Sequence, residues 1–329
     1  MLKTLVHVTN VCLHWGSLMI CIVICTRERP IMLRRVLESC AKITTGMRSE
    51  LQFLIIENGP EKGAREVVSG VEPQLNILYF NEPNLGIVNA RNAGIDAFLD
   101  TDADWMATID DDEIISDGWL TSMLDAIDAY PQCNVFSGPQ IRVLPENISQ
   151  WLISKPKPNP ETGTPVWNAS TANALFNRAV FAPDKMGLRF HPLFNLSGGS
   201  DTHLFFQLKD LGEDVLWVRD AECFEPMVIE RTHFRVRVKR TIQSAQSWGK
   251  SIILRSGKLR GGTVILRYAL ICSVNFISFG ICGGIVRIFS AKFGNAILNK
   301  SLTFGCHAVG YFKAILRPQG ELYANIDGE

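Results

Sequence analysis

The stretch Trp105-Met-Ala-Thr-Ile-Asp-Asp-Asp-Glu113 joins a short apolar run to four consecutive acidic residues. The apolar part has a β-branched centre and predicts the end of a buried strand. Adjacent carboxylates repel one another, so beside a buried strand they need a counter-charge. The simplest one is a divalent cation with oxygen ligands, Mg²⁺ or Mn²⁺, shared with a diphosphate. A solvated acidic turn before the next helix explains these residues equally well, so the stretch alone leaves both readings open.

Strand and helix signals alternate on both sides of this stretch. Apolar, largely non-alternating strands separated by helices predict a parallel sheet with helices on both faces. The fold class is therefore expected to be α/β with a doubly wound, mostly parallel sheet, in which ligands bind at the carboxyl ends of the strands. The expected strands are 19–25, 51–56, 76–80, 105–109, 134–138 and 214–218, the expected helices are 31–42, 61–69, 89–100, 119–128 and 202–210, and 145–165 is expected to be a connecting loop.

Several common sites are missing from the sequence. No G-x-G-x-x-G follows the first expected strand and no Walker lysine motif occurs, which argues against a dehydrogenase and a P-loop NTPase. The nine cysteines and six histidines contain no C-x-x-C pair and no zinc-ligand spacing. An odd cysteine count without a recognisable secretory signal favours a reducing cytosol.

A net charge of zero conceals a strong asymmetry along the chain. Residues 226–317 carry fifteen Lys/Arg and one acid, a net of +14, whereas residues 1–225 carry eighteen Lys/Arg and twenty-nine acids, a net of −11. A basic half favours anionic partners. Residues 268–286 are nineteen in number and uncharged, close to the ~20 that a transmembrane helix needs. We expect a helical tail that associates with a membrane, by insertion or at the interface, and keep a buried helical hairpin as the alternative.

Five motifs follow one another in a recognisable order. Through them, from Met19 to about Gly249, the chain resembles the family-2 glycosyltransferases of the GT-A type, particularly the bacterial exopolysaccharide transferases of the succinoglycan β-glucosyltransferase kind. Each motif is weak by itself, the third is the most specific, and five in order are strong. They are Cys25-Thr-Arg-Glu-Arg-Pro30, Ile55-Ile-Glu-Asn-Gly59, Asn84-Leu-Gly86 with Ala90-Arg-Asn-Ala-Gly94, Asp110-Asp-Asp112, and Gly198-Gly-Ser-Asp-Thr202.

The resemblance implies a division of the chain. Residues 1–18 would be an N-terminal extension, with Met19 as an alternative start. Residues 19–230 would form the GT-A catalytic domain, with a nucleotide-binding half at 19–115 and an acceptor half at 116–230. Residues 231–329 would be the basic, membrane-associated tail.

The resemblance also implies which residues bind the donor. Thr26 would contact the base or ribose, Glu57 would read uracil or ribose, and Arg91 would lie beside the diphosphate, a task that suits a guanidinium. The alternatives are an exposed turn acid for Glu57 and a helix-surface ion pair with Asp96 or Asp100 for Arg91. The full set of expected donor-binding residues is Thr26, Arg29, Glu57, Asn84, Arg91, Asp110 and Asp111.

The expected metal ligands and general base come from the last two motifs. Alternate residues of an extended segment point the same way, so Asp110 and Asp112 would share a face. By resemblance Asp112 is the best metal ligand and Asp110 lies nearer the ribose or metal. Asp201 is the expected general base, at the start of a helix whose dipole stabilises its charge. The family commonly has an acid before this aspartate, where this chain has Ser200; a plain helix N-cap is the alternative for Asp201.

The resemblance implies an inverting, Mn²⁺- or Mg²⁺-dependent glycosyltransferase that uses a nucleoside-diphosphate sugar, expected to be a UDP-sugar. The expected acceptor is a lipid-linked (polyprenyl diphosphate) saccharide at the cytoplasmic face of the bacterial inner membrane, with no nucleic-acid partner. A processive polysaccharide synthase is one alternative. Such enzymes carry a Q-x-x-R-W motif and several transmembrane helices, whereas the nearest stretch here is Gln243–Trp248 and at most two spans are possible, which argues against it. A sugar-1-phosphate nucleotidyltransferase shares the sheet layout, but that family has a Gly-rich, Arg-containing loop after the first strand, and this chain lacks it. A non-catalytic, nucleotide-binding membrane scaffold is the remaining alternative.

Overall fold

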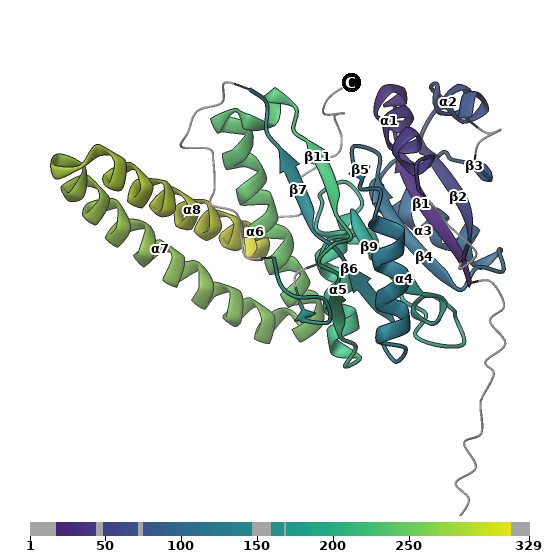
Figure 1. The fold of residues 1–329 in the computed structure, drawn as a ribbon. Coiled ribbons are helices and arrows are strands. Elements are labelled where there is room, and N and C mark those ends of the chain that lie inside the picture. The colour runs from purple at the N-terminus through teal and green to yellow at the C-terminus, as the bar shows by residue number, and fades with distance from the viewer. Residues whose placement is uncertain (1–17, 44–48, 72–74, 147–158, 168, 317–329) are drawn as a thin grey trace, which may run out of the picture.

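An eight-stranded sheet forms the centre of the computed structural model, which describes residues 18–43, 49–71, 75–146, 159–167 and 169–316 (Figure 1). The strand order is β3-β2-β1-β4-β9-β6-β10-β8. Neighbours from β3 to β4 run parallel, as do β6 and β10, whereas β9 runs antiparallel between β4 and β6 and β8 runs antiparallel to β10. The strands are β1 (Leu18–Thr26), β2 (Ser49–Asn58), β3 (Ile77–Glu82), β4 (Trp105–Asp110), β6 (Val135–Ser137), β8 (Pro165–Val166), β9 (Asn173–Asn177) and β10 (Val215–Trp217).

Helices cover both faces of this sheet, which confirms the predicted fold class. Helices α1 (Pro30–Cys40), α2 (Ala64–Val71) and α4 (Trp119–Ala129) pack on one face, and α3 (Ile87–Leu99) and α5 (Ser200–Asp210) on the other. In β1 the side chains of residues 20, 22 and 24 enter the first core and those of residues 21 and 23 the second. A strand buried on both faces must be apolar throughout, which is why no alternation is visible in its sequence.

A second, three-stranded sheet that the sequence did not predict lies at the carboxyl end of β4. Its order is β5-β11-β7, from β5 (Ile114–Ile115), β11 (Cys223–Pro226) and β7 (Gln140–Val143). Strand β4 ends at Asp110 and strand β5 begins at Ile114, directly after the acidic run, so the run connects the two sheets. These strands are only two to four residues long, too short for a periodic pattern. The described residues also contain three short 3₁₀ helices: Arg178–Val180 after β9, Pro192–Phe194 and Ile229–Thr232.

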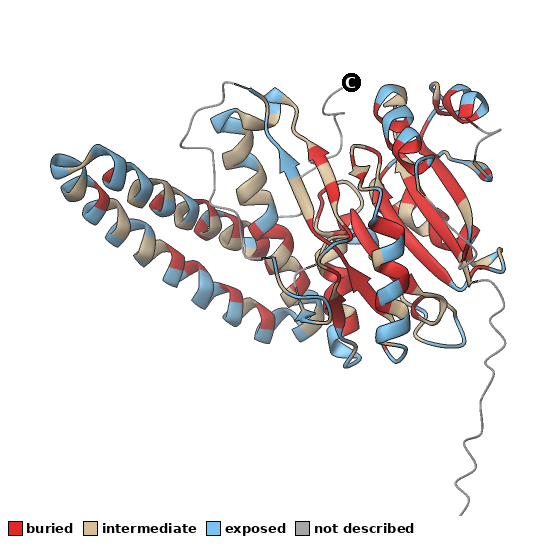
Figure 2. Cartoon of the chain, viewed as in Figure 1, coloured by how far each residue is buried: buried red, intermediate tan, exposed pale blue. Residues whose placement is uncertain are grey.

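The C-terminal region is helical, as predicted, and consists of α6 (Phe234–Ser256), α7 (Lys258–Phe289) and α8 (Ala291–Leu316). Figure 1 shows α7 and α8 side by side as a long hairpin that projects away from the sheet. Exposed residues run along the whole length of this hairpin in Figure 2, whereas the central strands of the sheet are almost entirely buried. Among the described residues, α7 alone is long and apolar enough to cross a membrane, with a mean hydropathy of 2.0 over its most apolar window. The hairpin therefore exists, but the alternative that buried it in the core is wrong.

Two of the expected segments fall on residues outside the described part of the chain. They are the N-terminal extension, of which only Leu18 is described, and residues 147–158 of the expected 145–165 loop. The expected boundary at residue 230 runs through a set of shared contacts. Ser247 of α6 donates a hydrogen bond to the Gly198 carbonyl (2.9 Å), and Trp248 packs among aromatic side chains of α5, α7 and α8. The first helix of the tail is thus built onto the catalytic half.

Candidate active site

The carboxyl ends of the parallel strands bring three of the five motifs to one edge of the sheet. In the strand register Cys25 lies beside Asp110, and Thr26 lies beside Glu57. Parallel strands present their carboxyl ends on the same side, so residues more than eighty positions apart become neighbours there. This edge is the one where the sequence predicted a donor site.

Asp111 lies at the centre of this edge and binds the first motif. Its Oδ2 accepts a hydrogen bond from the Thr26 hydroxyl (2.8 Å), and its Oδ1 pairs with Arg29 (3.0 Å). Only 5% of the residue is exposed. Burial raises its pKa to about 6, with Asp112 and Asp110 adding to the effect and Arg29 and the Thr26 hydroxyl opposing it. The acidic run and the loop after β1 are therefore one bonded unit.

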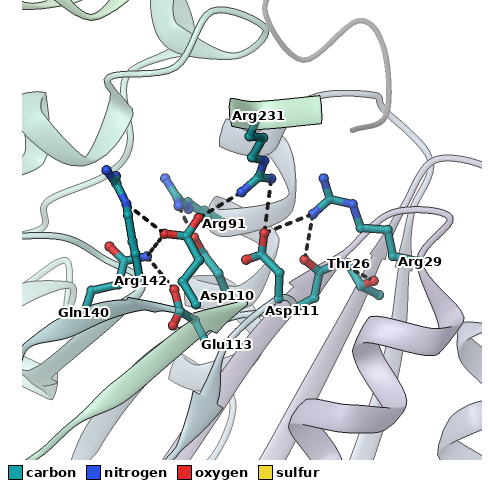
Figure 3. A network of polar contacts seen from close by, with 11 residues as sticks. Thr26, Arg29, Arg91, Asp110, Asp111, Glu113, Gln140, Arg142 and Arg231 are labelled. Atoms are coloured by element: carbon teal, nitrogen blue, oxygen red, sulfur yellow. Dashed lines mark hydrogen bonds and ion pairs between the residues drawn. The ribbon is translucent and has the colours of Figure 1, made fainter. Parts of the chain in front are cut away.

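Asp112 is held by two arginines, one of which, Arg231, was not predicted from the sequence. Arg231 lies 3.1 Å from its Oδ2 and Arg29 lies 3.7 Å away, and Arg231 also pairs with Glu225 of β11 at 2.8 Å. Figure 3 shows Arg29, Arg91 and Arg231 reaching into the acidic cluster from different directions. Guanidinium groups thus supply the counter-charge that the three aspartates require. Arg231 carried no signal in the sequence beyond its place at the start of a basic segment.

Arg91 connects the third, fourth and fifth motifs. Its guanidinium lies 3.4 Å from the Asp110 carboxylate and donates a hydrogen bond to the Ser200 hydroxyl (2.9 Å), and it lies over the Phe190 ring. The carboxylate that pairs with Arg91 is thus Asp110, and not Asp96 or Asp100 as in the expected alternative. Ser200 is almost fully buried, and its hydroxyl occupies the position where the resemblance led us to expect an acid.

Asp201 follows directly and lies at the first turn of α5. Gly199 is the N-cap residue, in the left-handed region with φ +88°, so Asp201 is not the plain N-cap that was the alternative. One of its carboxylate oxygens accepts the Thr202 backbone N–H at 2.7 Å. The side chain is close enough to Asp110 to act on its pKa, which is raised by desolvation first and by Asp112 and Asp201 further, against Arg91. The fold therefore brings the expected general base to the acidic run.

The expectation that Asp110 and Asp112 point the same way does not hold, for a local reason. The strand ends at Asp110, and a turn closed by a hydrogen bond from the Glu113 N–H to the Asp110 carbonyl (3.2 Å) follows at once. Alternation applies only to extended backbone. In the turn, Asp111 and Asp112 share Arg29, whereas Asp110 pairs with Arg91.

The predicted contact of Glu57 with the base does not fit its position. Glu57 is fully buried, and its carboxylate accepts the backbone N–H groups of Lys62 (2.8 Å) and Ala64 (3.4 Å) and the Tyr79 hydroxyl (2.5 Å). It therefore fixes the loop that leads into α2, and neither of its expected roles, base contact or exposed turn acid, describes it. Asn84 is exposed, and its side chain folds back onto Glu82 (2.8 Å).

Glu113, the last residue of the acidic stretch, is buried, and no role for it was predicted from the sequence. It is 1% exposed and accepts a hydrogen bond from Gln140, and its Oε2 has no hydrogen-bond partner among the described residues. Burial raises its pKa to about 9, with Asp110 and Glu225 contributing, so Glu113 is neutral at pH 7. Its partners come from β7 and β11, short strands without a motif, so no sequence signal could have found this group.

The residues at this edge fit a divalent cation by their donor chemistry. Asp110 and Asp112 offer carboxylate oxygens, the hard ligands that Mg²⁺ and Mn²⁺ prefer. The Asp110 side chain is 41% exposed, and Asp112 borders a hollow of about 160 Å³ that Asp111, Glu113 and Met227 also line. Among the described residues no group of three His, Cys, Asp or Glu could hold a metal unaided. A cation bound by one or two carboxylates together with substrate phosphates matches that arrangement.

Comparison with known proteins identifies the class. The profile of the family described as glycosyl transferase family 2 matches residues 21–183. The chain is 30% identical over 245 residues to the succinoglycan biosynthesis protein ExoM of Rhizobium meliloti (strain 1021), a match that covers 72% of this chain and 76% of that protein. The chain therefore belongs to glycosyltransferase family 2 and is a glycosyltransferase.

Solved structures agree on the fold. The mannosyltransferase PcManGT from Pyrobaculum calidifontis, in complex with GDP-Man and Mn²⁺, has a TM-score of 0.60 at 11% identity and covers 90% of this chain and 87% of its own. Residues 1–349 of S. aureus TarS, in complex with UDP-GlcNAc, have a TM-score of 0.52 at 12% identity, with 91% and 90% covered. At such low identity these similarities establish the GT-A-type fold and nothing finer.

Proposed function

We propose that this protein is an inverting, divalent-metal-dependent glycosyltransferase that moves one sugar from a UDP-sugar to a lipid-linked (polyprenyl diphosphate) saccharide in exopolysaccharide biosynthesis, at the cytoplasmic face of the inner membrane. The observation that supports the proposal is the bridge from Arg91 to Asp110 and Ser200, because Ser200 directly precedes Asp201 in the first turn of α5. The similarity to ExoM supports the pathway class, and the UDP-GlcNAc complex of TarS supports the donor class.

Each part of the donor would have residues of suitable chemistry. Thr26, Arg29 and Asp111 form the floor beneath the nucleoside, and Asn84 borders the same edge of the sheet. Arg91 is placed to neutralise a diphosphate, because a guanidinium matches phosphate oxygens in shape and charge. Asp110 and Asp112 would hold a Mg²⁺ or Mn²⁺ ion, which when bound supplies positive charge to the leaving diphosphate.

The reaction would then depend on Asp201. Its carboxylate accepts the proton from an acceptor hydroxyl while that oxygen attacks the anomeric carbon. The bond from that carbon to the diphosphate oxygen breaks on the opposite side, so a single displacement inverts the configuration. The Arg91 guanidinium orients the Asp110 carboxylate and fixes the start of α5 through Ser200, which keeps Asp201 facing the donor.

A panel of nucleoside diphosphates, each tested with Mn²⁺, Mg²⁺ or EDTA for its effect on the melting temperature, tests this proposal. A ligand at about 100-fold excess over its Kd stabilises the folded state by roughly 2.7 kcal/mol. We expect UDP with Mn²⁺ to stabilise the protein and EDTA to abolish the effect. A preference for GDP or dTDP would keep the enzyme class and overturn the UDP-sugar assignment. No response to any nucleotide, with the protein folded and metal present, would contradict the proposed donor site.

Metal-dependent hydrolysis of the donor distinguishes this proposal from the non-catalytic scaffold. A scaffold binds the nucleotide and leaves the UDP-sugar intact, whereas a transferase without its acceptor releases free sugar slowly to water. The Asp201→Asn variant supplies the background rate for this measurement.

A further inference from the structure

Between Tyr268 and Val286, helix α7 is almost entirely apolar on the sides that it does not turn toward α8, with Ser273, Asn275 and Ser278 as the few polar side chains. On the side directly opposite α8, four aliphatic side chains are more than half exposed: Leu270 (54%), Val274 (62%), Ile281 (62%) and Ile285 (55%). No charged residue lies between Arg267 and Arg287. A segment with so few polar groups has no polar side to turn toward water, which favours an apolar surrounding medium. The sheet and its helices do not provide that medium, because the hairpin projects away from them (Figures 1 and 2).

Helix α8 is different, because one side of it is polar. Lys292, Asn295, Lys300 and Thr303 are all exposed. The opposite side packs against α7 through small residues: a Cβ added to Gly283 would lie 2.9 Å from Leu298, and a Cβ added to Gly305 would lie 2.9 Å from the Phe276 ring. At 3.6 residues per turn, the polar positions of α8 point away from α7. The hairpin as a whole therefore has an apolar layer, α7, and a polar layer, α8.

The two helices are held together as one unit. The Ser301 hydroxyl of α8 donates a hydrogen bond to the Phe276 carbonyl of α7 (2.6 Å), and the small residues between them allow their backbones to approach closely. This is the kind of packing that joins helices in lipid, where apolar burial between them contributes little. The two helices would therefore bind a membrane as one rigid unit, so the orientation of α7 fixes that of α8.

We propose that the α7–α8 hairpin lies flat on an anionic phospholipid surface, with α7 immersed among the lipid chains and α8 above it at the level of the headgroups. The charge supports this partner, because the hairpin itself, residues 258–316, contains seven Lys/Arg and no Asp or Glu. Basic residues beside a membrane are attracted by anionic lipid. The inference rests on the membrane location in the proposed function and identifies what binds the membrane and how.

A hairpin that crosses the bilayer fits the same residues less well. The uncharged nineteen residues of α7 would extend about 28 Å, close to the ~30 Å of hydrocarbon, so length alone permits a span. Helix α8 would have to cross beside it, and only twelve residues separate Lys300 from Lys313. Lys300 and Thr303 would then face hydrocarbon near the middle of the helix, where a charge is strongly disfavoured. In the flat arrangement both reach the headgroup layer.

Flotation of the full chain with lipid vesicles tests the surface. We expect binding to phosphatidylcholine vesicles that contain phosphatidylglycerol, and weaker binding without phosphatidylglycerol or at high salt. The double variant Val274→Lys/Ile281→Lys should lower partitioning by about tenfold or more, because two charges would enter the lipid. Thr303→Lys is the matched control on the polar side and should not weaken binding. Unchanged binding of the double variant, or equal losses in both, would overturn the proposal.

Cysteine labelling in spheroplasts distinguishes lying flat from crossing. In a chain with Cys12 and Cys282 replaced by serine, we introduce Ser290→Cys at the hairpin tip, Thr303→Cys on α8, or Lys209→Cys on the catalytic half. A membrane-impermeant maleimide should label none of the three before lysis and all three after it. Labelling of Ser290→Cys in intact spheroplasts would show a crossing hairpin, and a Thr303→Cys that stays unlabelled after lysis would place α8 in hydrocarbon; either result overturns the proposal.

Two further readouts separate this inference from its alternatives. Nucleotide-dependent stabilisation should be unchanged in Val274→Lys/Ile281→Lys, so a failure of the donor site and a failure of the membrane surface give different results. Light scattering without lipid tests whether a second copy of the chain covers the exposed aliphatic face of α7. A dimer that Val274→Lys/Ile281→Lys dissociates, together with no binding to vesicles, would assign this face to self-association and overturn the lipid proposal.

Discussion

Asp201 and Asp210 stand near opposite ends of α5, and only Asp201 lies beside the acidic run. We expect Asp201→Asn to retain UDP and Mn²⁺ binding and to lose transfer by about 10²–10⁴-fold, the usual contribution of a positioned general base. Asp210→Asn is the matched control, since it removes an exposed ion pair with Arg255 and should leave transfer near the wild-type rate. Initial rates of sugar transfer measure both. Near wild-type transfer by Asp201→Asn would show that another group takes the proton.

Asp112 should behave differently from Asp201, because it is expected to hold the metal in the ground state as well. We predict that Asp112→Asn weakens both donor binding and transfer and raises the Mn²⁺ concentration needed for half-maximal rate. The melting temperature without ligand must be measured beside these values, because Asp112 also pairs with Arg29 and Arg231. If the Mn²⁺ dependence of Asp112→Asn equals that of the wild type, the metal lies elsewhere.

His203 makes folding stability depend on pH in a defined window. Burial first, then His191 and Arg255, lower its pKa from 6.5 to about 4, against a smaller opposing effect of Asp210. Between these values the unfolded chain binds a proton that the folded protein does not, so stability falls as the pH drops from 6.5 toward 4. The loss is on the order of 3 kcal/mol. The difference in unfolding free energy between wild type and His203→Phe, measured by urea denaturation, should show it; a pH-independent difference would contradict the assignment.

At the scale of the elements, the turn before α5 depends on Gly199. Its φ is +88°, and a Cβ there would lie 2.4 Å from the Ser247 Cβ of α6. Gly212 has a similar φ, +80°, with nothing within 4 Å of an added Cβ. Both alanine variants carry the backbone cost of about 1 kcal/mol. Gly199→Ala should lose at least about 1 kcal/mol more, because the overpacked contact forces α5 and α6 apart. Equal losses in chemical denaturation would show that the two helices separate freely.

The elements also explain why some predictions succeeded. Residues 19–25, 51–56 and 105–109 were expected as strands because they are apolar without alternation, and each lies within an observed strand. The turn at Asp111 and Asp112 was missed because it is set by the start of β5 and by Arg29, which lie on either side of the run. Strands β5, β7 and β11 were missed because two to four residues carry no period.

At the scale of the whole molecule, Arg231 joins the tail to the catalytic sheet. Its side chain is 11% exposed, and it neutralises Asp112 and Glu225, which are 12% and 9% exposed. Arg231→Gln leaves Asp112 with Arg29 alone and Glu225 with Arg142 alone, and we expect a loss of about 2–3 kcal/mol in unfolding free energy. Mn²⁺ with UDP should recover part of the loss by supplying positive charge to Asp112. Arg65→Gln is the control: it removes an exposed i, i+4 pair with Glu61 and a contact over the Tyr79 ring, and should change stability by under about 1 kcal/mol.

A loss in Arg231→Gln no larger than that in Arg65→Gln would contradict the role given to Arg231. Calorimetry with and without Mn²⁺ and UDP separates this outcome from a general destabilisation, because a general effect would be the same in both conditions. The same comparison shows whether the tail and the donor site are energetically connected.

The sequence by itself determined the α/β class, the approximate place of most longer elements and the aspartates at the end of β4, because these follow from local hydrophobic pattern and from ordered motifs. It also predicted that the tail is helical, basic and apolar. Only the tertiary structure decided which charged and polar side chains meet. Arg231, Glu225 and Gln140 join the acidic run from segments far along the chain. Glu57 turned inward to fix a loop, because two backbone N–H groups and a tyrosine satisfy it there. Pairing across such distances leaves no period in the sequence, since it depends on how the sheets, turns and helices pack in space.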